Sequence, residues 1–188
     1  MSIEKIISGG QTGVDRAALD VAITLGFPHG GWIPAGRWAE DGRIHKHYNL
    51  QETPSSETAQ RTEWNVRDSD ATLIISNGAL QGGTLLTLEL AIKYNNSCLH
   101  IELSVVTENE GIKLIADWLE SKDCKILNVA GPRSSEDSEI YRQTYELLMG
   151  IFAPAHWSAR LTLHKGASPL SFSQVKPCTP SAERIQNA

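Results

Sequence analysis

A glycine-rich segment near the N-terminus carries residue types that bind anions, directly before a predicted helix. Gly9-Gly10-Gln11-Thr12-Gly13 follows the apolar run 3–8, and Asp15 and Arg16 come within the next turn. A helix N-terminus directs free backbone N–H groups and the positive end of the helix dipole to one point, which is how proteins hold phosphate. We therefore expect a phosphate site over residues 9–16. Asp15 could alternatively serve only to complement the helix dipole.

Two further loops have the same character and also follow predicted strands. Ligands of an open parallel sheet bind beyond the carboxyl ends of its strands, so we expect the three loops to converge on one site. Each glycine-rich turn could also exist only because the backbone must turn tightly there. The predicted binding residues are Gly9, Gly10, Gln11, Thr12, Gly13, Asp15 and Arg16 in the first segment, Asn77, Gly82, Gly83, Thr84 and Thr87 in the second, and Gly131, Arg133 and Ser134 in the third.

Two arginines are candidates for contacts with the ligand. Arg133 lies between Pro132 and Ser134, where its guanidinium could clamp a phosphate through two hydrogen bonds. The other interpretation is a surface arginine that pairs with Glu136 or Asp137. Arg37 and Trp38 lie in the long connection 27–54 and could cover a planar ring, although this connection could also be an ordinary solvated loop.

The common phosphate and metal motifs are missing from these segments. No lysine follows Gly13, which excludes the P-loop pattern G-x-x-x-x-G-K-[ST], and Gly9 and Gly10 are adjacent, which excludes G-x-G-x-x-G. No G-x-S-x-G nucleophile motif occurs. The pair His45 and His47 has no Cys-x-x-Cys or His-Glu-x-x-His beside it, so we predict no metal site.

The elements that must position these loops alternate between strands and helices. This alternation predicts an α/β fold with a mostly parallel central sheet covered on both faces, a three-layer sandwich. Gly26 is the expected C-cap of the first helix, Ser55 or Ser56 the N-cap of the second, and Ser134 or Ser135 that of the last. The helix ending near Tyr94 is apolar nearly all round, so we expect it deep in the fold. The expected strands are 3–8, 71–76, 98–103 and 125–130, with a short one near 32–33, and the expected helices cover about 14–25, 57–68, 85–94, 112–119 and 140–151.

Composition divides the 188 residues into a ligand-binding domain, 1–152, and a tail, 153–188, rich in serine and proline and expected to be extended or disordered. The net charge of −5 combines a tail of +3 with a body of −8. An acidic body argues against binding a nucleic-acid polymer, and no apolar run reaches the roughly 18 residues of a membrane span. Cys98, Cys124 and Cys178 are widely spaced, which favours idle thiols and a cytoplasmic location.

Taken together, the motifs of this chain resemble the family of proposed molybdenum carriers, a circularly permuted YpsA-related branch of the SLOG superfamily. The resemblance covers about residues 3–152. It is carried by the segments Gly9-Gly10-Gln11-Thr12-Gly13-Val14-Asp15-Arg16-Ala17-Ala18-Leu19-Asp20, Gly30-Gly31-Trp32-Ile33-Pro34 with Arg37 and Glu40-Asp41-Gly42, Arg61-Thr62 with Asn65-Val66-Arg67-Asp68-Ser69-Asp70, Gly82-Gly83-Thr84 with Thr87, and Leu127-Asn128-Val129-Ala130-Gly131-Pro132-Arg133.

This resemblance implies a Rossmann-like fold, a pocket for a nucleotide-like or pterin phosphate, and a homo-oligomer. It also implies carriage of the molybdenum cofactor (molybdopterin), or a role as a sensor of such a ligand. Carriage is consistent with the absence of metal-ligand spacing because the metal would ride on the dithiolene sulfurs of the pterin. The protein would then supply only phosphate and ring contacts.

Two other functions stay open at this point. Related phosphoribohydrolases carry Gly-Gly-x-Gly-Thr-x-x-Glu and cleave a nucleotide N-glycosidic bond. Aligning Gly83-Thr84 with that motif puts Thr87 in place of the glutamate, whereas aligning Gly82-Gly83 recovers Glu89 but loses Gly-Thr. The candidate acid–base residues for this activity are Asp15, Asp41 and Glu89. The third candidate is a non-catalytic interaction module that uses the basic tail.

Overall fold

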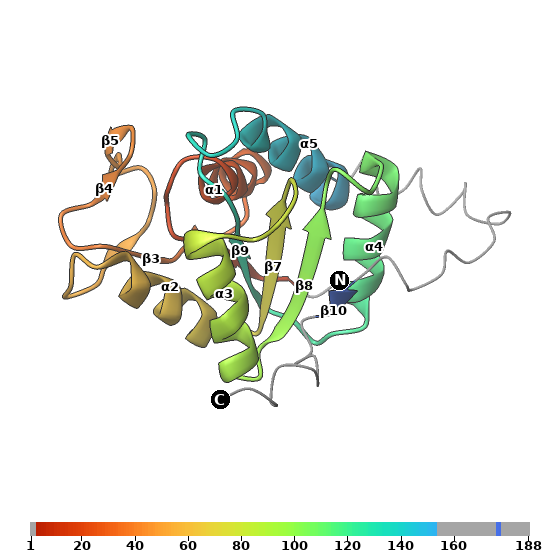
Figure 1. The fold of residues 1–188 in the computed structure, drawn as a ribbon, viewed down its shortest axis with the longest axis horizontal. Coiled ribbons are helices and arrows are strands. Elements are labelled where there is room, and N and C mark those ends of the chain that lie inside the picture. The colour runs from red at the N-terminus through yellow and green to blue at the C-terminus, as the bar shows by residue number, and fades with distance from the viewer. Residues whose placement is uncertain (1–2, 154–175, 178–188) are drawn as a thin grey trace, which may run out of the picture.

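A mostly parallel sheet forms the centre of the protein. The computed structural model describes residues 3–153 and 176–177. Its central sheet has six strands in the order β10-β8-β7-β9-β1-β2 (Figure 1). Strand β10 pairs antiparallel with β8, and the other neighbours are parallel. The strands are β1 (Lys5–Ile7), β2 (His29–Gly30), β7 (Ala71–Ser76), β8 (Ser97–Glu102), β9 (Ile126–Ala130) and β10 (Lys176–Pro177).

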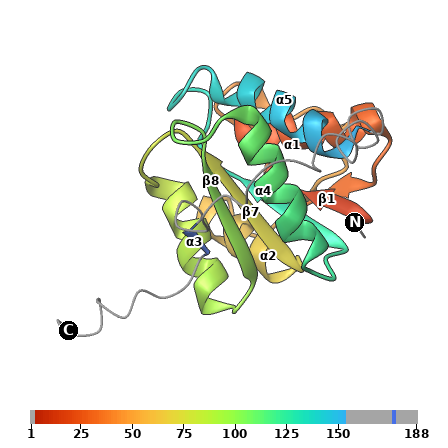
Figure 2. The same ribbon diagram turned by 90° about the vertical axis from the view of Figure 1, so that its right-hand side faces the viewer.

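Helices cover both faces of this sheet. Helices α1 (Val14–Leu25), α4 (Glu108–Glu120) and α5 (Ile140–Phe152) pack on one face and enclose the largest apolar core. Helices α2 (Thr58–Arg67) and α3 (Gly82–Lys93) cover the other face around a smaller cluster (Figure 2). The structure therefore confirms the predicted α/β three-layer sandwich with a Rossmann-like arrangement.

Strand β9 shows how the sheet becomes polar on the α2 and α3 side. Side chains of a strand alternate between its faces, so Leu127 and Val129 join the large apolar core while Asn128 faces the other way. Asn128 is buried, and its amide donates to the hydroxyl of Thr72 on β7 at 3.4 Å. A polar floor thus lies between the sheet and α2.

The long connection after β2 contains short strands and an apolar core of its own. The expected strand at 32–33 is confirmed as β3 (Trp32–Ile33), which pairs parallel with β6 (Gln51–Glu52). Strands β4 (Trp38–Ala39) and β5 (Gly42–Arg43) form an antiparallel hairpin. Leu19 of α1 packs into a core of this connection's own apolar side chains, which are Ile33, Ile44, Tyr48 and Leu50. Two-residue strands such as β2 are too short for a periodicity signal, so the sequence did not reveal them.

Helix ends agree with the expectations only in part. Gly26 adopts the left-handed conformation, with φ of 73°, and caps α1 as expected. The N-cap of α2 is Glu57 rather than Ser55 or Ser56, because the Ser55 hydroxyl accepts from the Glu57 backbone N–H before the helix begins. The N-cap of α5 is Glu139. Ser134 and Ser135 do not cap it because turns occupy the chain up to Ile140.

Helix α3 is not buried on all sides, contrary to the expectation. Leu85 and Ile92 are 38% and 37% exposed. The helix lies on the outside of the sheet and packs mainly against α2, β7 and β8, so one side of it faces away from the core. The apolar residues on the outer side of α3 therefore form an exposed apolar face.

The structure also bears on the expectations for the cysteines and the tail. Cys124 is a buried thiol that donates to the Ile126 carbonyl at 3.6 Å, and burial raises its pKa to about 12, as fits an idle thiol. Cys98 is disulfide-bonded, so the expectation of idle thiols is wrong at that residue. The predicted tail lies outside the described residues except for β10. Within the described residues, no helix has the length and apolar character needed to cross a membrane.

Two glycines in the post-strand loops allow a direct test of this packing. A Cβ atom on Gly131 would lie 2.2 Å from the carbonyl oxygen of Ile75 and 2.5 Å from Cγ2 of Val14. A Cβ atom on Gly83 would meet nothing within 4 Å. We predict that G131A lowers the free energy of unfolding by about 2 kcal/mol or more through overpacking, whereas G83A causes no loss. Urea denaturation measures both, and equal midpoints for the two variants would contradict the packing described.

Candidate functional site

The loops after β1 and β9 meet at the carboxyl edge of the sheet. Strand order reverses between β1 and β7, with β9 between them, which is where open α/β sheets bind ligands. The Val14 N–H donates to the Pro132 carbonyl at 3.2 Å, and the Ser134 N–H donates to the Thr12 hydroxyl at 3.1 Å. Gly13 makes this approach possible, since a Cβ atom there would lie 2.3 Å from the Pro132 oxygen.

The loop after β7 reaches the same edge by a side-chain contact. The Asn77 amide donates to Asp137 at 2.6 Å and to Gln143 at 2.8 Å, both in the segment that follows β9. The three loops predicted from the sequence are therefore neighbours in space. The first and third touch through their backbones, and the second joins them through Asn77.

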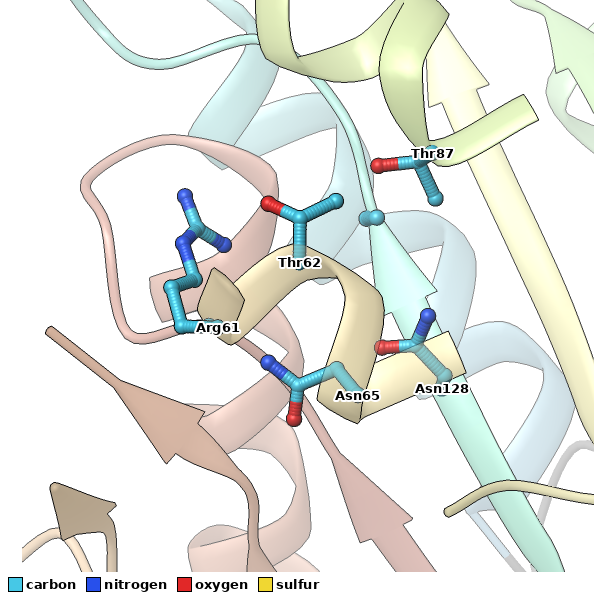
Figure 3. Close-up of a pocket in the computed structure, with 7 residues that line it drawn as sticks. Arg61, Thr62, Asn65, Thr87 and Asn128 are labelled. Carbon is cyan, nitrogen blue, oxygen red and sulfur yellow. The ribbon is translucent and has the colours of Figure 1, made fainter. Parts of the chain in front are cut away.

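A recess opens between α2, α3 and the sheet at this edge (Figure 3). Its volume is about 170 Å³ with its open mouth included. Helix α2 contributes three polar side chains to it, α3 contributes Thr87, and β9 contributes Asn128. The complete lining is Gly9, Arg61, Thr62, Asn65, Thr87, Asn128 and Ala130. No carboxylate belongs to this lining.

The hydroxyl groups of both recess threonines donate hydrogen bonds to backbone carbonyls of their own helices. Thr62 donates to the Thr58 carbonyl at 3.0 Å, and Thr87 donates to the Gly83 carbonyl at 2.9 Å. Their oxygens keep free lone pairs, which accept hydrogen bonds from N–H or O–H groups. The Nε of Arg61 is buried and has no partner among the described residues, so a donor lies beside these acceptors. The lining therefore suits the polar edge of a ring that both donates and accepts.

Arg61 is held in place by a buried ion pair. Its Nη1 lies 3.1 Å from Oδ2 of Asp15, which also accepts from the Gln11 N–H at 3.3 Å. Burial raises the pKa of Asp15, although the Arg61 guanidinium opposes this rise. Gly9 makes room for the pair, because a Cβ atom on it would lie 1.7 Å from Nη1 of Arg61. Asp15 thus orients Arg61 and lies below the recess surface.

A second feature of the site is an anion cradle, which we define as Thr12, Arg133 and Ser135. The carboxylate of Glu40 occupies it. Glu40 accepts from the Ser135 backbone N–H at 3.0 Å and from the hydroxyls of Ser135 and Thr12. Nε of Arg133 lies 3.9 Å away. Burial by itself would raise the pKa of Glu40, but the hydrogen bonds from Ser135 and Thr12 outweigh burial and hold that pKa below its usual range.

Two of the predicted ligand arginines, Arg133 and Arg16, have partners at this edge. Arg133 is 46% exposed and pairs with Glu136 at 3.2 Å, as the surface interpretation expected, in addition to its approach to Glu40. Arg16 pairs with Asp41 at 3.2 Å and donates to the Gly10 carbonyl. An anion that binds here must therefore compete with carboxylates.

Arg37 lies elsewhere than the sequence suggested. Its guanidinium is buried inside the connection and donates to four backbone carbonyls, those of Ile44, His45, Tyr48 and Leu50. The neighbouring Trp38 is 64% exposed. The geometry assigns Arg37 to the support of the β4–β5 hairpin. The hairpin itself is largely solvent-exposed at Trp38, Glu40, Asp41 and Arg43, as the solvated-loop alternative expected.

The remaining predicted residues divide between the site and its surroundings. Thr87 lines the recess and Thr84 is buried beneath it. Gly82, Gly83 and Glu89 are exposed on α3 and do not belong to the lining. In the described part of the chain, no group of three His, Cys, Asp or Glu side chains is placed to hold a metal ion.

Sequence reasoning missed most of the recess. Arg61, Thr62 and Asn65 were noted only as part of a family resemblance, although their spacing of i, i+1 and i+4 puts polar groups on one helix face. That spacing beside a hydrophobic strand was an available signal. Asn128 in an otherwise apolar strand was another. Glu40 was also noted only as part of the resemblance, since its role depends on a contact with Ser135, 95 positions away.

Comparison with known proteins places this architecture in a family. A model of the circularly permutated YpsA SLOG family matches residues 6–152. The protein belongs to this family. It is also similar to a crystal structure from Syntrophus aciditrophicus SB of a protein named "Putative molybdenum carrier protein", with 52% identity and a TM-score of 0.80 over 81% of this chain and 96% of that one. Curated proteins yield no match.

The supporting role of Arg37 in this SLOG family protein gives a stability prediction. R37M removes charge-assisted hydrogen bonds to four backbone carbonyls, so we expect a loss of about 3 kcal/mol or more in the free energy of unfolding. R43M, which alters an exposed arginine of the same hairpin, should change it by no more than about 0.5 kcal/mol. Chemical denaturation of both variants measures the difference. Stability of R37M equal to that of R43M would refute the supporting role.

Proposed function

We propose that the protein binds a phosphorylated ring compound, nucleotide-like or a pterin, and carries the molybdenum cofactor or senses such a ligand. The observation that supports this most is the position of the anion cradle directly beside the polar recess. Gly9 and Ala130 line the recess, and Thr12 and Arg133 lie three residues further along the same two loops. Three residues of chain span at most about 11 Å, which suits a phosphate on a short linker from a ring.

The recess fits one edge of a ring rather than a whole ligand. Its volume of about 170 Å³ includes open solvent at the mouth, so the enclosed space is far smaller than the roughly 300–1,000 Å³ of typical ligand pockets. Thr62, Thr87 and Arg61 would hold the polar edge of a pterin, and the body of the ring would lie across the mouth. Thr12, Arg133 and Ser135 would hold the phosphate.

Molybdenum enters this proposal as cargo. In the cofactor the metal is bound by the dithiolene sulfurs of the pterin, so a carrier needs contacts to the phosphate and the ring and no metal ligands of its own. The name of the 52%-identical Syntrophus protein supports molybdenum as the metal concerned. The family match supports the same ligand class for the domain formed by residues 1–152.

Nucleotide N-glycoside hydrolysis is not favoured by the placement of the candidate carboxylates. A general acid or base must lie within hydrogen-bond reach of the scissile bond. Asp15 is buried against Arg61, Asp41 pairs with Arg16, and Glu89 is exposed on α3. Thr87, which cannot act as a carboxylate, takes the position on α3 that faces the recess.

We further propose that the protein is a homo-oligomer. The exposed apolar residues on and beside α3, Leu85, Ile92 and Tyr94, support a contact between copies, because water-facing apolar groups gain free energy when a partner covers them. Light scattering on the full chain should give a mass of at least twice 20.6 kDa. A monomer mass at micromolar concentration would reject the oligomer.

The ligand proposal predicts what purified protein contains and how one arginine contributes. Mass spectrometry of the released ligand should identify a phosphorylated pterin, with molybdenum in matching amount by elemental analysis. In calorimetric titrations with a pterin that carries a side-chain phosphate, R133A should bind at least tenfold more weakly than the unaltered protein because it loses a charge-assisted contact. R142A, which removes an exposed arginine of α5, should bind like the unaltered protein.

Two outcomes would reject this proposal. One is equal affinity of R133A and R142A. The other is release of free base from nucleoside monophosphates at a rate that E89Q abolishes, which would establish the hydrolase instead. Gly13→Val is unsuitable as a binding probe, since its side chain would collide with the Pro132 carbonyl and disturb the loops themselves.

A further inference from the structure

Glu40 occupies the cradle as an anion supplied by the protein itself. It lies at the tip of the β4–β5 hairpin, between Ala39 and Gly42, and reaches across to the loop after β9. Its side chain is 22% exposed, and its carboxylate accepts hydrogen bonds from the Ser135 N–H and from two hydroxyl groups. A carboxylate and a phosphate oxygen use the same donors, and each of these N–H and O–H groups has one proton to give.

The hairpin is anchored at its base and held at its tip by side chains. At the base, the Arg37 guanidinium joins four carbonyls and the Gly36 N–H donates to Glu52 at 2.7 Å. At the tip, the Glu40 N–H donates to Gln11 at 2.9 Å and Asp41 pairs with Arg16. The tip contacts are polar and partly exposed, so water can replace them more readily than the buried contacts of the base.

We propose that Glu40 is an internal competitor for the anion site, which a ligand phosphate must displace from Thr12 and Ser135 before it binds. This inference rests on the proposed function in taking the cradle as the phosphate site. Displacement moves the tip away and carries Asp41 with it. Arg133 then loses its longer contact with Glu40 and keeps Glu136, while Arg16 loses Asp41.

This arrangement makes Glu40 a determinant of specificity. Inorganic phosphate must displace Glu40 with its own contacts alone. A phosphate joined to a ring has the recess contacts with Arg61, Thr62 and Thr87 in addition, and these favour the displaced state. The protein therefore discriminates against free phosphate and selects phosphates that carry a ring.

The test uses inorganic phosphate as the probe, in chloride buffer, with the full-length protein. Calorimetry should show at least tenfold tighter phosphate binding by E40A than by the unaltered protein, and a gain in the same direction for the isosteric E40Q. E136Q removes a carboxylate from the same arginine but leaves Glu40 in the cradle, so its gain should be much smaller. E52Q makes the same charge change at the base of the hairpin and should bind like the unaltered protein. Circular dichroism checks that each variant is folded.

Amide hydrogen exchange of a peptide that covers residues 38–43 provides a second measurement. Saturating phosphate should increase exchange of this peptide in the unaltered protein, because the tip leaves the cradle, and should change it little in E40A. Phosphate affinity of E40A and E40Q no higher than that of E136Q would overturn the proposal, and so would protection of residues 38–43 on binding.

The Glu40 proposal and the ligand proposal can fail independently of each other. Tighter phosphate binding by E40A in a protein that carries no phosphorylated ring would leave Glu40 as the competitor and reject the carrier. Ligand binding that depends on Arg133 with no gain in E40A or E40Q would keep the ligand proposal and overturn the role of Glu40.

Discussion

The close approach of the loops after β1 and β9 is the constraint on which the candidate site depends. The Pro132 carbonyl packs against Gly13 so closely that any side chain there would collide with it. The Ile75 carbonyl packs against Gly131 in the same way. Because of these contacts, Thr12 lies beside Ser134 and Ser135, and Gly9 lies beside Ala130. The cradle and the recess are two consequences of this one packing arrangement. Gly13 and Gly131, which look like ligand contacts in the sequence, let backbone approach backbone.

Electrostatic balance at this edge follows from the same arrangement. The body of the chain is acidic, with a net charge of −8, yet α1, α2 and the loop after β9 each contribute an arginine to this edge: Arg16, Arg61 and Arg133. Each guanidinium is paired with a carboxylate, so the arginines are held in position without repelling one another. These ion pairs differ in burial. Asp15 and Arg61 form a buried pair, whereas Asp41, Glu40 and Glu136 are partly exposed, so a ligand can replace them as partners of the arginines. The buried pair sets the geometry, and the exposed pairs can be exchanged.

Sequence patterns predicted the elements that are long and periodic, and the structure confirms the parallel sheet with helices on both faces. They failed where a residue's role depends on distant contacts. Arg37 looks like a ligand arginine because it stands beside Gly36 and Trp38, but the carbonyls that capture it come from residues 44–50, whose path no local pattern gives. Ser135 looks like a helix cap, but its hydroxyl binds Glu40 instead. The leucine-rich sequence of α3 predicts burial on all sides, because composition alone does not indicate which leucines face water.

The small size of the recess and the occupied cradle have a common explanation. A site that is closed by its own carboxylate does not need a large preformed cavity, since the ring edge alone enters the recess while the phosphate takes the place of Glu40. In this proposal, binding of either part favours binding of the other, because both favour the state in which the hairpin tip has left the cradle. A ligand that lacks one part obtains only a fraction of this favourable free energy. The selectivity of the site would then arise from the linkage between two modest contacts rather than from the strength of either one.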